Sequence, residues 1–119
     1  MDLNHLHLHV RSMPRAQAFY ERYFGLRELV RHGSVVFMRD AAGMDLALAP
    51  DPEPQPMPPW FHFGFRLASP EQVERLHADM LAAGVAMREP LTHEDAMVYF
   101  RCADPDGYAI EVYWELQPA

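Results

Sequence analysis

The sequence predicts an α+β fold that contains two copies of one module, each with the order strand, helix and three strands. Three observations predict it: two segments with a period of two, a capped amphipathic helix after each, and matching turn motifs late in each copy. The chain has 119 residues, of which 50% are hydrophobic and 23% are charged. A chain of this size and composition can bury a core without disulfide bonds.

Two segments, residues 3–10 and 61–67, alternate between apolar residues and polar residues or glycine. Successive side chains of a strand point to opposite faces, so the period of two predicts a strand in each segment. Both strands therefore have one apolar and one polar face. The polar faces carry four histidines, a glycine and an arginine: His5, His7, His9, His62, Gly64 and Arg66.

A helix is expected after each of these strands. In the second copy, Ser69 is placed as the N-cap and Gln72 as the side chain that reaches back, which is a capping-box pattern. Residues 12–14 are a weaker version of this pattern in the first copy. Apolar residues then recur at helical spacing, and Gly25 and Gly84 predict where the two helices end.

The final two strands of each copy align without a gap, residues 40–47 over residues 104–111. Both copies have an aspartate followed three residues later by a glycine, which predicts a tight hairpin turn. Residues 92–95 are expected to form a loop. The six strands expected after the two helices lie near 26–31, 34–40, 44–49, 86–89, 96–103 and 108–114.

A segment rich in proline joins the two copies. Residues 50–59 contain six prolines, and this composition predicts a stiff, extended linker. We therefore expect one domain over residues 1–119, with a first module at 1–49, the linker at 50–59 and a second module at 60–119.

Charge and residue usage exclude several functional classes. The net charge of −7 argues against a nucleic-acid partner, and the ten basic residues are all arginine, so no lysine can serve as a catalytic base or Schiff-base former. Cys102 is the only cysteine, which excludes an internal disulfide and a thiolate metal cluster. We expect no membrane span and no signal peptide, and hence a cytoplasmic location.

Three residues form a candidate metal site. His5 and His62 occupy the same place in the first strands of the two copies, and Glu111 lies in the last strand of the second copy. If the first strands pair, the three side chains face a common concavity. Two imidazoles and a carboxylate suit Fe, Mn, Zn, Ni or Co as divalent ions and leave coordination positions open for a substrate.

These motifs resemble the vicinal oxygen chelate superfamily, which includes glyoxalase I, extradiol dioxygenases, fosfomycin-resistance thiol transferases, methylmalonyl-CoA epimerase and bleomycin-resistance proteins. The resemblance implies a cup-shaped mixed β-sheet around a divalent metal, with the helices on the outer face. It also implies that the metal ligands are His5, His62 and Glu111. The segments that carry the resemblance are residues 3–6, 18–21 and 24–26, the strand with His62, and residues 104–111.

The resemblance favours some activities over others. Glyoxalase I and the epimerase have a fourth ligand where this chain has Ala47, and the nearby Asp45 lies two residues away on the strand. Extradiol dioxygenases and fosfomycin enzymes typically have a tyrosine where this chain has Arg101. The leading hypothesis is a metal-dependent enzyme, dioxygenase-like or resistance-transferase-like, and a glyoxalase I, lyase or epimerase activity ranks below it. The alternative is a drug-sequestering, bleomycin-resistance-like binding protein.

Other polar residues share the faces of the predicted ligands. His7 is a candidate for proton transfer, and Arg101 is a candidate for binding an anionic oxygen, so both are catalytic candidates. The alternatives are a solvated strand face for His7 and a salt bridge to an acidic neighbour for the arginines. The candidates for binding a small-molecule substrate are His7, Arg66, Tyr99, Arg101 and Tyr113.

The expected assembly is a homodimer, because many short members of the superfamily pair. The linker can reach roughly 30 Å, so the first module of one chain could pack against the second module of its partner. His5 would then come from one subunit and the other two ligands from its partner; the alternative is one cup within one chain. Cys102 is expected to be buried, and the aromatic residues Trp60, Phe61, Phe63 and Phe65 are expected to pack in the core or between the modules.

Overall fold

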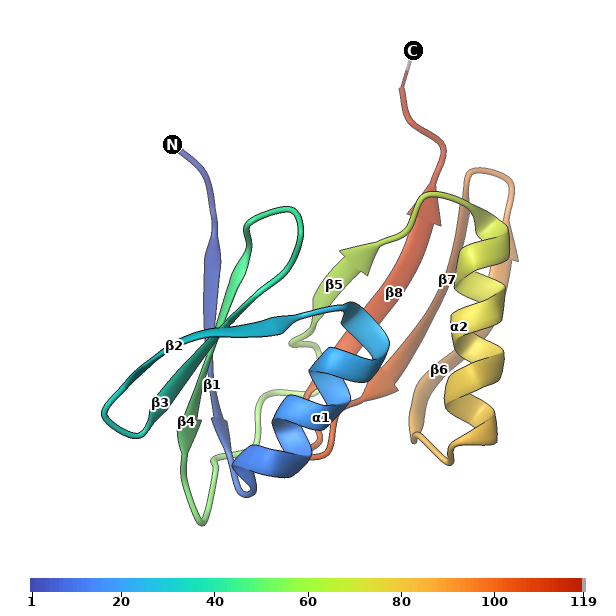
Figure 1. The fold of residues 1–119 in the computed structure, drawn as a ribbon. Helices are drawn as coiled ribbons and strands as arrows, with labels where there is room; N and C mark the ends of the chain where they lie inside the picture. The colour runs from blue at the N-terminus through green and yellow to red at the C-terminus, as the bar shows by residue number, and fades with distance from the viewer. Residues whose placement is uncertain (119) are drawn as a thin grey trace. The chain divides into compact units, whose positions relative to one another are not determined.

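A computed structural model describes residues 1–118, which form two compact units that divide between Pro56 and Met57. Each unit has the predicted order of one strand, one helix and three strands (Figure 1). The elements of the first unit are β1 (His5–Val10), α1 (Met13–Phe24), β2 (Arg27–His32), β3 (Val35–Arg39) and β4 (Asp45–Pro50). Those of the second are β5 (Phe63–Arg66), α2 (Pro70–Ala82), β6 (Met87–Glu94), β7 (Met97–Ala103) and β8 (Ala109–Glu115).

The first unit is a four-stranded mixed sheet with the order β1-β4-β3-β2. The first strand lies parallel to β4, and the remaining pairs are antiparallel. Helix α1 packs against β4 on one face of the sheet, so the apolar faces of the strands form the core and the polar face of β1 stays exposed. The buried side chains of this core include Leu8, Val10, Phe19, Tyr20, Val36, Met38, Leu46 and Leu48.

The second unit repeats this arrangement with the order β5-β8-β7-β6. Here β5 lies parallel to β8, and the remaining pairs are antiparallel. Helix α2, yellow in Figure 1, packs against β7 and β8. The core beneath it includes Val73, Met80, Val98, Phe100, Cys102, Ile110 and Val112.

The strand register confirms the internal repeat at the level of single residues. In the second unit Gly64 lies opposite Glu111, and in the first unit His7 lies opposite Ala47. His62 precedes Gly64 by two residues, as the equivalent histidine of β1 precedes His7. The predicted equivalence of His5 and His62 therefore follows from strand pairing as well as from alignment.

The two predicted hairpin turns have the same construction. The carboxylate Oδ1 of Asp104 accepts hydrogen bonds from the backbone N–H groups of Asp106 and Tyr108, each at 2.9 Å. In the first unit Oδ1 of Asp40 accepts from the backbone N–H of Met44 at 3.0 Å. Gly43 and Gly107 have φ values of 90° and 91°, which an L side chain rarely adopts.

The predicted cap of the second helix is present. The Ser69 hydroxyl accepts a hydrogen bond from the backbone N–H of Gln72 at 3.2 Å, and the Gln72 side chain accepts one from the backbone N–H of Ala68 at 3.0 Å. Ser12 makes the corresponding bond to the backbone N–H of Arg15 at 3.4 Å in the first helix. Both helices therefore begin where the sequence predicts.

The sixth strand corrects one expectation. Residues 92–95 were expected to form a loop, but β6 continues through Pro90 to Glu94. This strand lies at the edge of its sheet, where the absence of an N–H group in proline costs no hydrogen bond to a further strand. Its pairing with β7 shifts register on both sides of Glu89. In this shifted pairing Glu89 lies opposite Arg101.

Burial at the start of the second unit differs in part from expectation. Trp60 is 74% exposed and therefore does not belong to the core of the chain, while Phe61, Phe63 and Phe65 are half-buried. Cys102 is fully buried, as predicted. Neither helix of residues 1–118 is long and apolar enough to cross a membrane.

Candidate functional site

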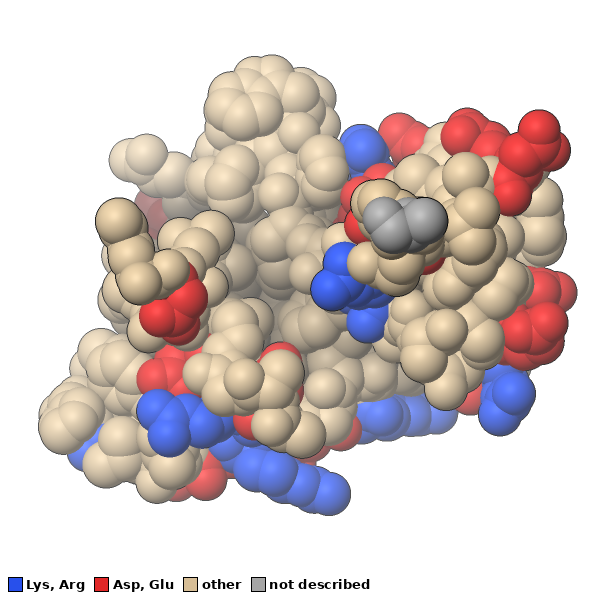
Figure 2. All heavy atoms as spheres, turned by 90° about the horizontal axis from the view of Figure 1, so that it is seen from above, with Lys and Arg blue, Asp and Glu red and all other residues tan. Residues whose placement is uncertain are grey.

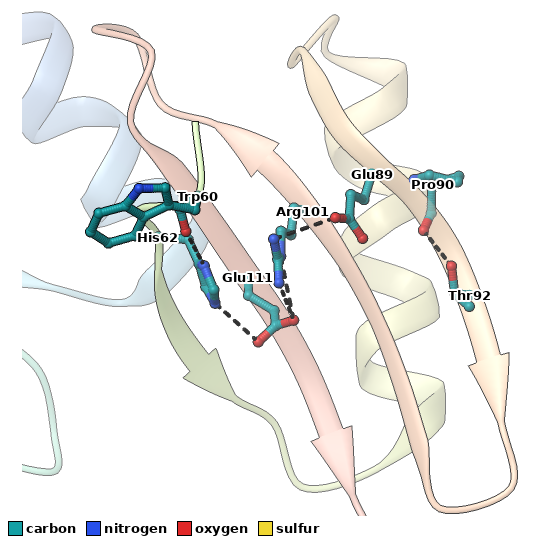
Figure 3. Close-up of polar contacts among 7 residues, drawn as sticks. All are labelled: Trp60, His62, Glu89, Pro90, Thr92, Arg101 and Glu111. Atoms are coloured by element: carbon teal, nitrogen blue, oxygen red, sulfur yellow. Dashed lines mark hydrogen bonds and ion pairs between the residues drawn. The ribbon is translucent and has the colours of Figure 1, made fainter. Parts of the chain in front are cut away.

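Two of the three predicted metal ligands lie together in the second unit. His62 immediately precedes β5, and Glu111 lies on the neighbouring β8 (Figure 3). The Nε2 atom of His62 is 3.9 Å from Oε2 of Glu111, and the Glu111 side chain is 15% exposed. Glycine at position 64 keeps the space beside Glu111 open, because a Cβ there would lie 3.2 Å from the Glu111 carbonyl oxygen.

The hydrogen bond of the other imidazole nitrogen defines the tautomer of His62. Nδ1 lies 3.1 Å from the carbonyl oxygen of Trp60, which can only accept, so Nδ1 is the donor. In the neutral imidazole the lone pair of Nε2 then faces a carboxylate oxygen of Glu111. Two acceptors in this arrangement fit a cation between them, and metal bonds of about 2.0–2.2 Å are compatible with their separation. A metal-bound histidine commonly donates its other ring N–H to an acceptor such as a backbone carbonyl, as Nδ1 of His62 does here.

Arg101 lies on β7 directly opposite Glu111 and between two carboxylates (Figure 3). Its Nε and Nη2 atoms each lie 3.5 Å from Oε1 of Glu111. Its Nη1 lies 3.3 Å from Oε1 of Glu89 on β6. The salt-bridge alternative considered for this arginine is therefore present, and one of its partners is a predicted metal ligand.

The other substrate-binding candidates of the second unit share this polar face. Tyr99 and Tyr113 lie opposite each other on β7 and β8, and Tyr113 is the second residue after Glu111. Arg66 lies next to Tyr113 in register, with its Nη1 atom 3.6 Å from Glu115. The face thus combines a histidine–carboxylate pair, two arginines and two phenol rings.

The histidines of β1 are exposed on the polar face of the first unit, as predicted. The Nδ1 atom of His5 donates to the side-chain oxygen of Asn4 at 3.0 Å, which leaves Nε2 as its ligand atom, as in His62. His7 and His9 are in edge contact, with ring centroids 5.2 Å apart. His9 donates to Asp51 at 2.9 Å, and this hydrogen bond lowers the pKa of the Asp51 carboxyl.

The first unit offers no counterpart of Glu111 in its described residues. Ala47 stands at the equivalent position and is only 3% exposed. Asp45 is bound by Arg39 through two hydrogen bonds of 2.6 and 3.0 Å. These bonds hold the pKa of the Asp45 carboxyl below its ordinary value. Asp45 is therefore engaged by an arginine rather than free to serve as the fourth ligand.

The structure thus brings together His62 and Glu111, and no third His, Cys, Asp or Glu completes a metal-binding group around them within residues 57–118. His5 belongs to the other unit. The sequence did not predict the contact of Glu89 with Arg101, because the strand that contains Glu89 was expected to end at residue 89. It also missed the carbonyl of Trp60, since a backbone contact leaves no signature in the residue types.

The surface charges agree with the composition. On the face drawn in Figure 2, arginine side chains (blue) lie among acidic side chains (red). Arginine and acidic side chains of the chain form ion pairs, among them Arg31 with Glu28 at 2.8 Å. This mixture is unlike the continuous basic face that binds nucleic-acid backbones.

A family model decides the relationship of the chain. The model of the Glyoxalase/Bleomycin resistance protein/Dioxygenase superfamily matches residues 2–112. The chain belongs to this superfamily. A solved structure described as a possible glyoxalase from Bacillus cereus is 36% identical, with a TM-score of 0.82, and the match covers 94% of this chain and 97% of that chain.

More distant structures share the superfamily fold. A glyoxalase/bleomycin resistance protein/dioxygenase family enzyme from Burkholderia phytofirmans PsJN is 18% identical with a TM-score of 0.81, over 98% of this chain and all of the other. The fosfomycin resistance protein FosX from Listeria monocytogenes is 23% identical with a TM-score of 0.79, over 96% of this chain and 93% of that chain. No curated protein matches the chain.

Proposed function

We propose that the chain is a divalent-metal-dependent enzyme whose small, oxygen-rich substrate chelates the metal through two oxygen atoms. The observation that carries this proposal is the lone pair of His62 Nε2 facing the Glu111 carboxylate, with Nδ1 anchored on the Trp60 carbonyl. Such a donor set suits Fe, Mn, Zn, Ni or Co as divalent ions. The bound ion would supply Lewis-acid stabilisation of a developing oxyanion or enolate.

His5 is the proposed third ligand. It is the repeat equivalent of His62, it is exposed, and its Nδ1 atom is likewise held by an oxygen acceptor. Three protein ligands leave coordination positions for the two substrate oxygens. We further propose a homodimer in the cytoplasm with two such sites.

The proposed reaction type is dioxygenase-like or resistance-transferase-like. A fourth carboxylate ligand, as in glyoxalase I, has no candidate in the first unit, because Ala47 cannot ligate and Asp45 is held by Arg39. The Bacillus cereus relative is described as a possible glyoxalase, which is one of the activities that the superfamily is named after. We therefore infer a metal site with three protein ligands rather than four.

The surrounding residues supply binding and proton transfer. Tyr99 and Tyr113 present two phenol groups beside Glu111, and Arg66 presents a cation at the end of β5. His7 is the proposed proton acceptor, since its imidazole is exposed on the same face of β1 as His5, two residues away. Each of these groups acts on the substrate without being required for metal binding.

Metal analysis tests the proposal and separates it from drug sequestration. Protein purified without added metal, and then dialysed against Mn²⁺, is expected to retain one divalent ion per chain. A Glu115→Gln variant is the matched control, because Glu115 lies on the same face of β8 but outside the predicted ligand set. An empty protein that still binds a cationic aromatic drug would instead support the sequestering alternative.

A further inference from the structure

Arg101 is held more loosely than another arginine of the chain in a carboxylate pair. Arg39 donates hydrogen bonds to both oxygens of Asp45, at 2.6 and 3.0 Å. These distances are close to the 2.7–2.9 Å typical of charge-assisted hydrogen bonds. Arg101 places two nitrogens 3.5 Å from a single oxygen of Glu111. Its Nε atom is buried and makes no hydrogen bond with any residue that the structure describes. The Arg101–Glu111 contact is therefore longer than the Arg39–Asp45 pair, and an anion with closer oxygens would bind this guanidinium better.

The two oxygens of Glu111 face different neighbours. Oε1 faces Arg101, whereas Oε2 is directed at Nε2 of His62 (Figure 3). A divalent cation bound by Glu111 and His62 would neutralise the carboxylate and repel the guanidinium. Arg101 would then have Glu89 as its remaining anionic partner.

The charge of the connected cluster changes sign on metal binding. The cluster consists of His62, Glu89, Arg101 and Glu111, which are linked in a row by the contacts described above. With a neutral imidazole its formal charge is −1, from two carboxylates and one guanidinium, and a divalent ion makes it +1. A positively charged, partly buried cluster favours an anionic ligand.

We propose that Arg101 recognises an anionic group of the substrate, a carboxylate or a phosphonate next to the chelating oxygens, and that metal binding releases it for this task. Glu89 is then the ion-pair partner that competes with the anion for the guanidinium. The inference rests on the proposed metal-dependent function and adds the substrate class. It requires that metal and anion bind cooperatively, each strengthening the other.

Binding of inorganic phosphate tests this inference in the full-length protein. Calorimetry would measure phosphate affinity with and without bound Mn²⁺. Acetohydroxamic acid, which is neutral in solution and chelates the ion as its hydroxamate, would serve as a bidentate chelator without a carboxylate or phosphate group. We expect Mn²⁺ to raise phosphate affinity at least about fivefold. Arg101→Gln should lower the affinity of the Mn²⁺-loaded protein for phosphate about tenfold or more. This is the effect expected when hydrogen bonds to a charged partner are lost.

Three controls make the result specific to Arg101. Arg101→Gln should bind Mn²⁺ at least as tightly as the wild type does, since it removes the guanidinium that the cation repels, and it should still bind acetohydroxamic acid. Glu89→Gln should raise phosphate affinity about two- to fivefold, since it removes a weak competing ion pair. Arg75→Gln, an exposed arginine of α2, should leave phosphate affinity unchanged.

The outcomes separate the inference from the function on which it rests. Wild-type protein that binds neither Mn²⁺ nor acetohydroxamic acid would overturn both. Wild-type protein that binds Mn²⁺ and the neutral chelator, but whose phosphate affinity is the same after Arg101→Gln, would overturn the role of Arg101 alone. Loss of Mn²⁺ binding in Arg101→Gln would also overturn it, because the arginine would then support the metal site itself.

Discussion

The Nε2 atom of His62 faces the carboxylate of Glu111 at a distance of 3.9 Å from Oε2, which is too long for a hydrogen bond. Both atoms are acceptors when the imidazole is neutral and donates Nδ1–H to Trp60. Two facing acceptors are the basis of the proposed cation site in the second unit. The first unit contains the equivalent histidine, His5, but no equivalent carboxylate among its described residues.

The Arg39–Asp45 pair predicts a pH dependence of stability. Hydrogen bonds from Arg39 lower the pKa of Asp45 from its ordinary value of 3.8, so the folded state favours the ionised carboxylate. The stabilisation is therefore complete above that ordinary value and is lost as pH falls through the lowered pKa of the folded state. Asp45→Asn should lower the urea midpoint at neutral pH, and the difference from wild type should vanish in acid. A difference that persists in acid would show that the pair acts by packing.

The Cys102 thiol is predicted to be unreactive in the folded protein. Burial raises its pKa to about 12, and the side chain is fully buried on β7. Because the thiolate is the nucleophile, iodoacetamide at about pH 8 should not alkylate it in buffer but should do so in concentrated urea. Mass spectrometry measures both rates. Rapid alkylation in buffer would mean that β7 opens readily.

Mixed dimers test whether two chains share each metal site. His5→Ala and Glu111→Ala chains would be unfolded together in equal amounts, refolded and assayed for bound metal. If His5 of one chain joins His62 and Glu111 of its partner, half of the dimers are mixed and each has one intact site, so about a quarter of the sites should recover. Each variant refolded alone is the control.

The same experiment has a clear contrary result. If each chain builds its own site, every site in the mixture carries one lesion and no metal binding returns. Well-refolded dimers without recovery would therefore reject the shared arrangement. The ligand assignment itself would be unaffected, because both variants are expected to lose metal in either arrangement.

Much of the fold could be predicted because local signals repeat. The alternation of β1, the Ser69 cap and the two Asp–Gly turns are properties of a few neighbouring residues, and each appears in the structure as expected. The end of β6 was missed because Pro90 indicates a break, whereas an edge strand with shifted register accommodates it. Trp60 is not part of the core because it is exposed, although an aromatic run in a sequence is typical of core residues.

The candidate site could be predicted only in part. Strand register brought Glu111 and Arg101 to one face, and alternation of side chains in β7 and β8 was enough to infer that. The contact between Arg101 and Glu89 depends on the bulged pairing of β6, and the anchor of His62 is a backbone carbonyl. Neither contact follows from residue type or spacing, so both required three-dimensional information.

Cobalt binding tests the central claim, that His5, His62 and Glu111 hold one divalent ion, most directly. Equilibrium dialysis with Co²⁺ would compare the wild type with His5→Ala, His62→Ala, Glu111→Gln and the control Glu115→Gln, with circular dichroism to verify folding. We predict one ion per wild-type or control chain. Binding should be at least about a hundredfold weaker in the other three variants, because losing a residue that only hydrogen-bonds a metal ligand already weakens metal binding about 10–100-fold. Unchanged Co²⁺ affinity in any one of those three folded variants would contradict the claim.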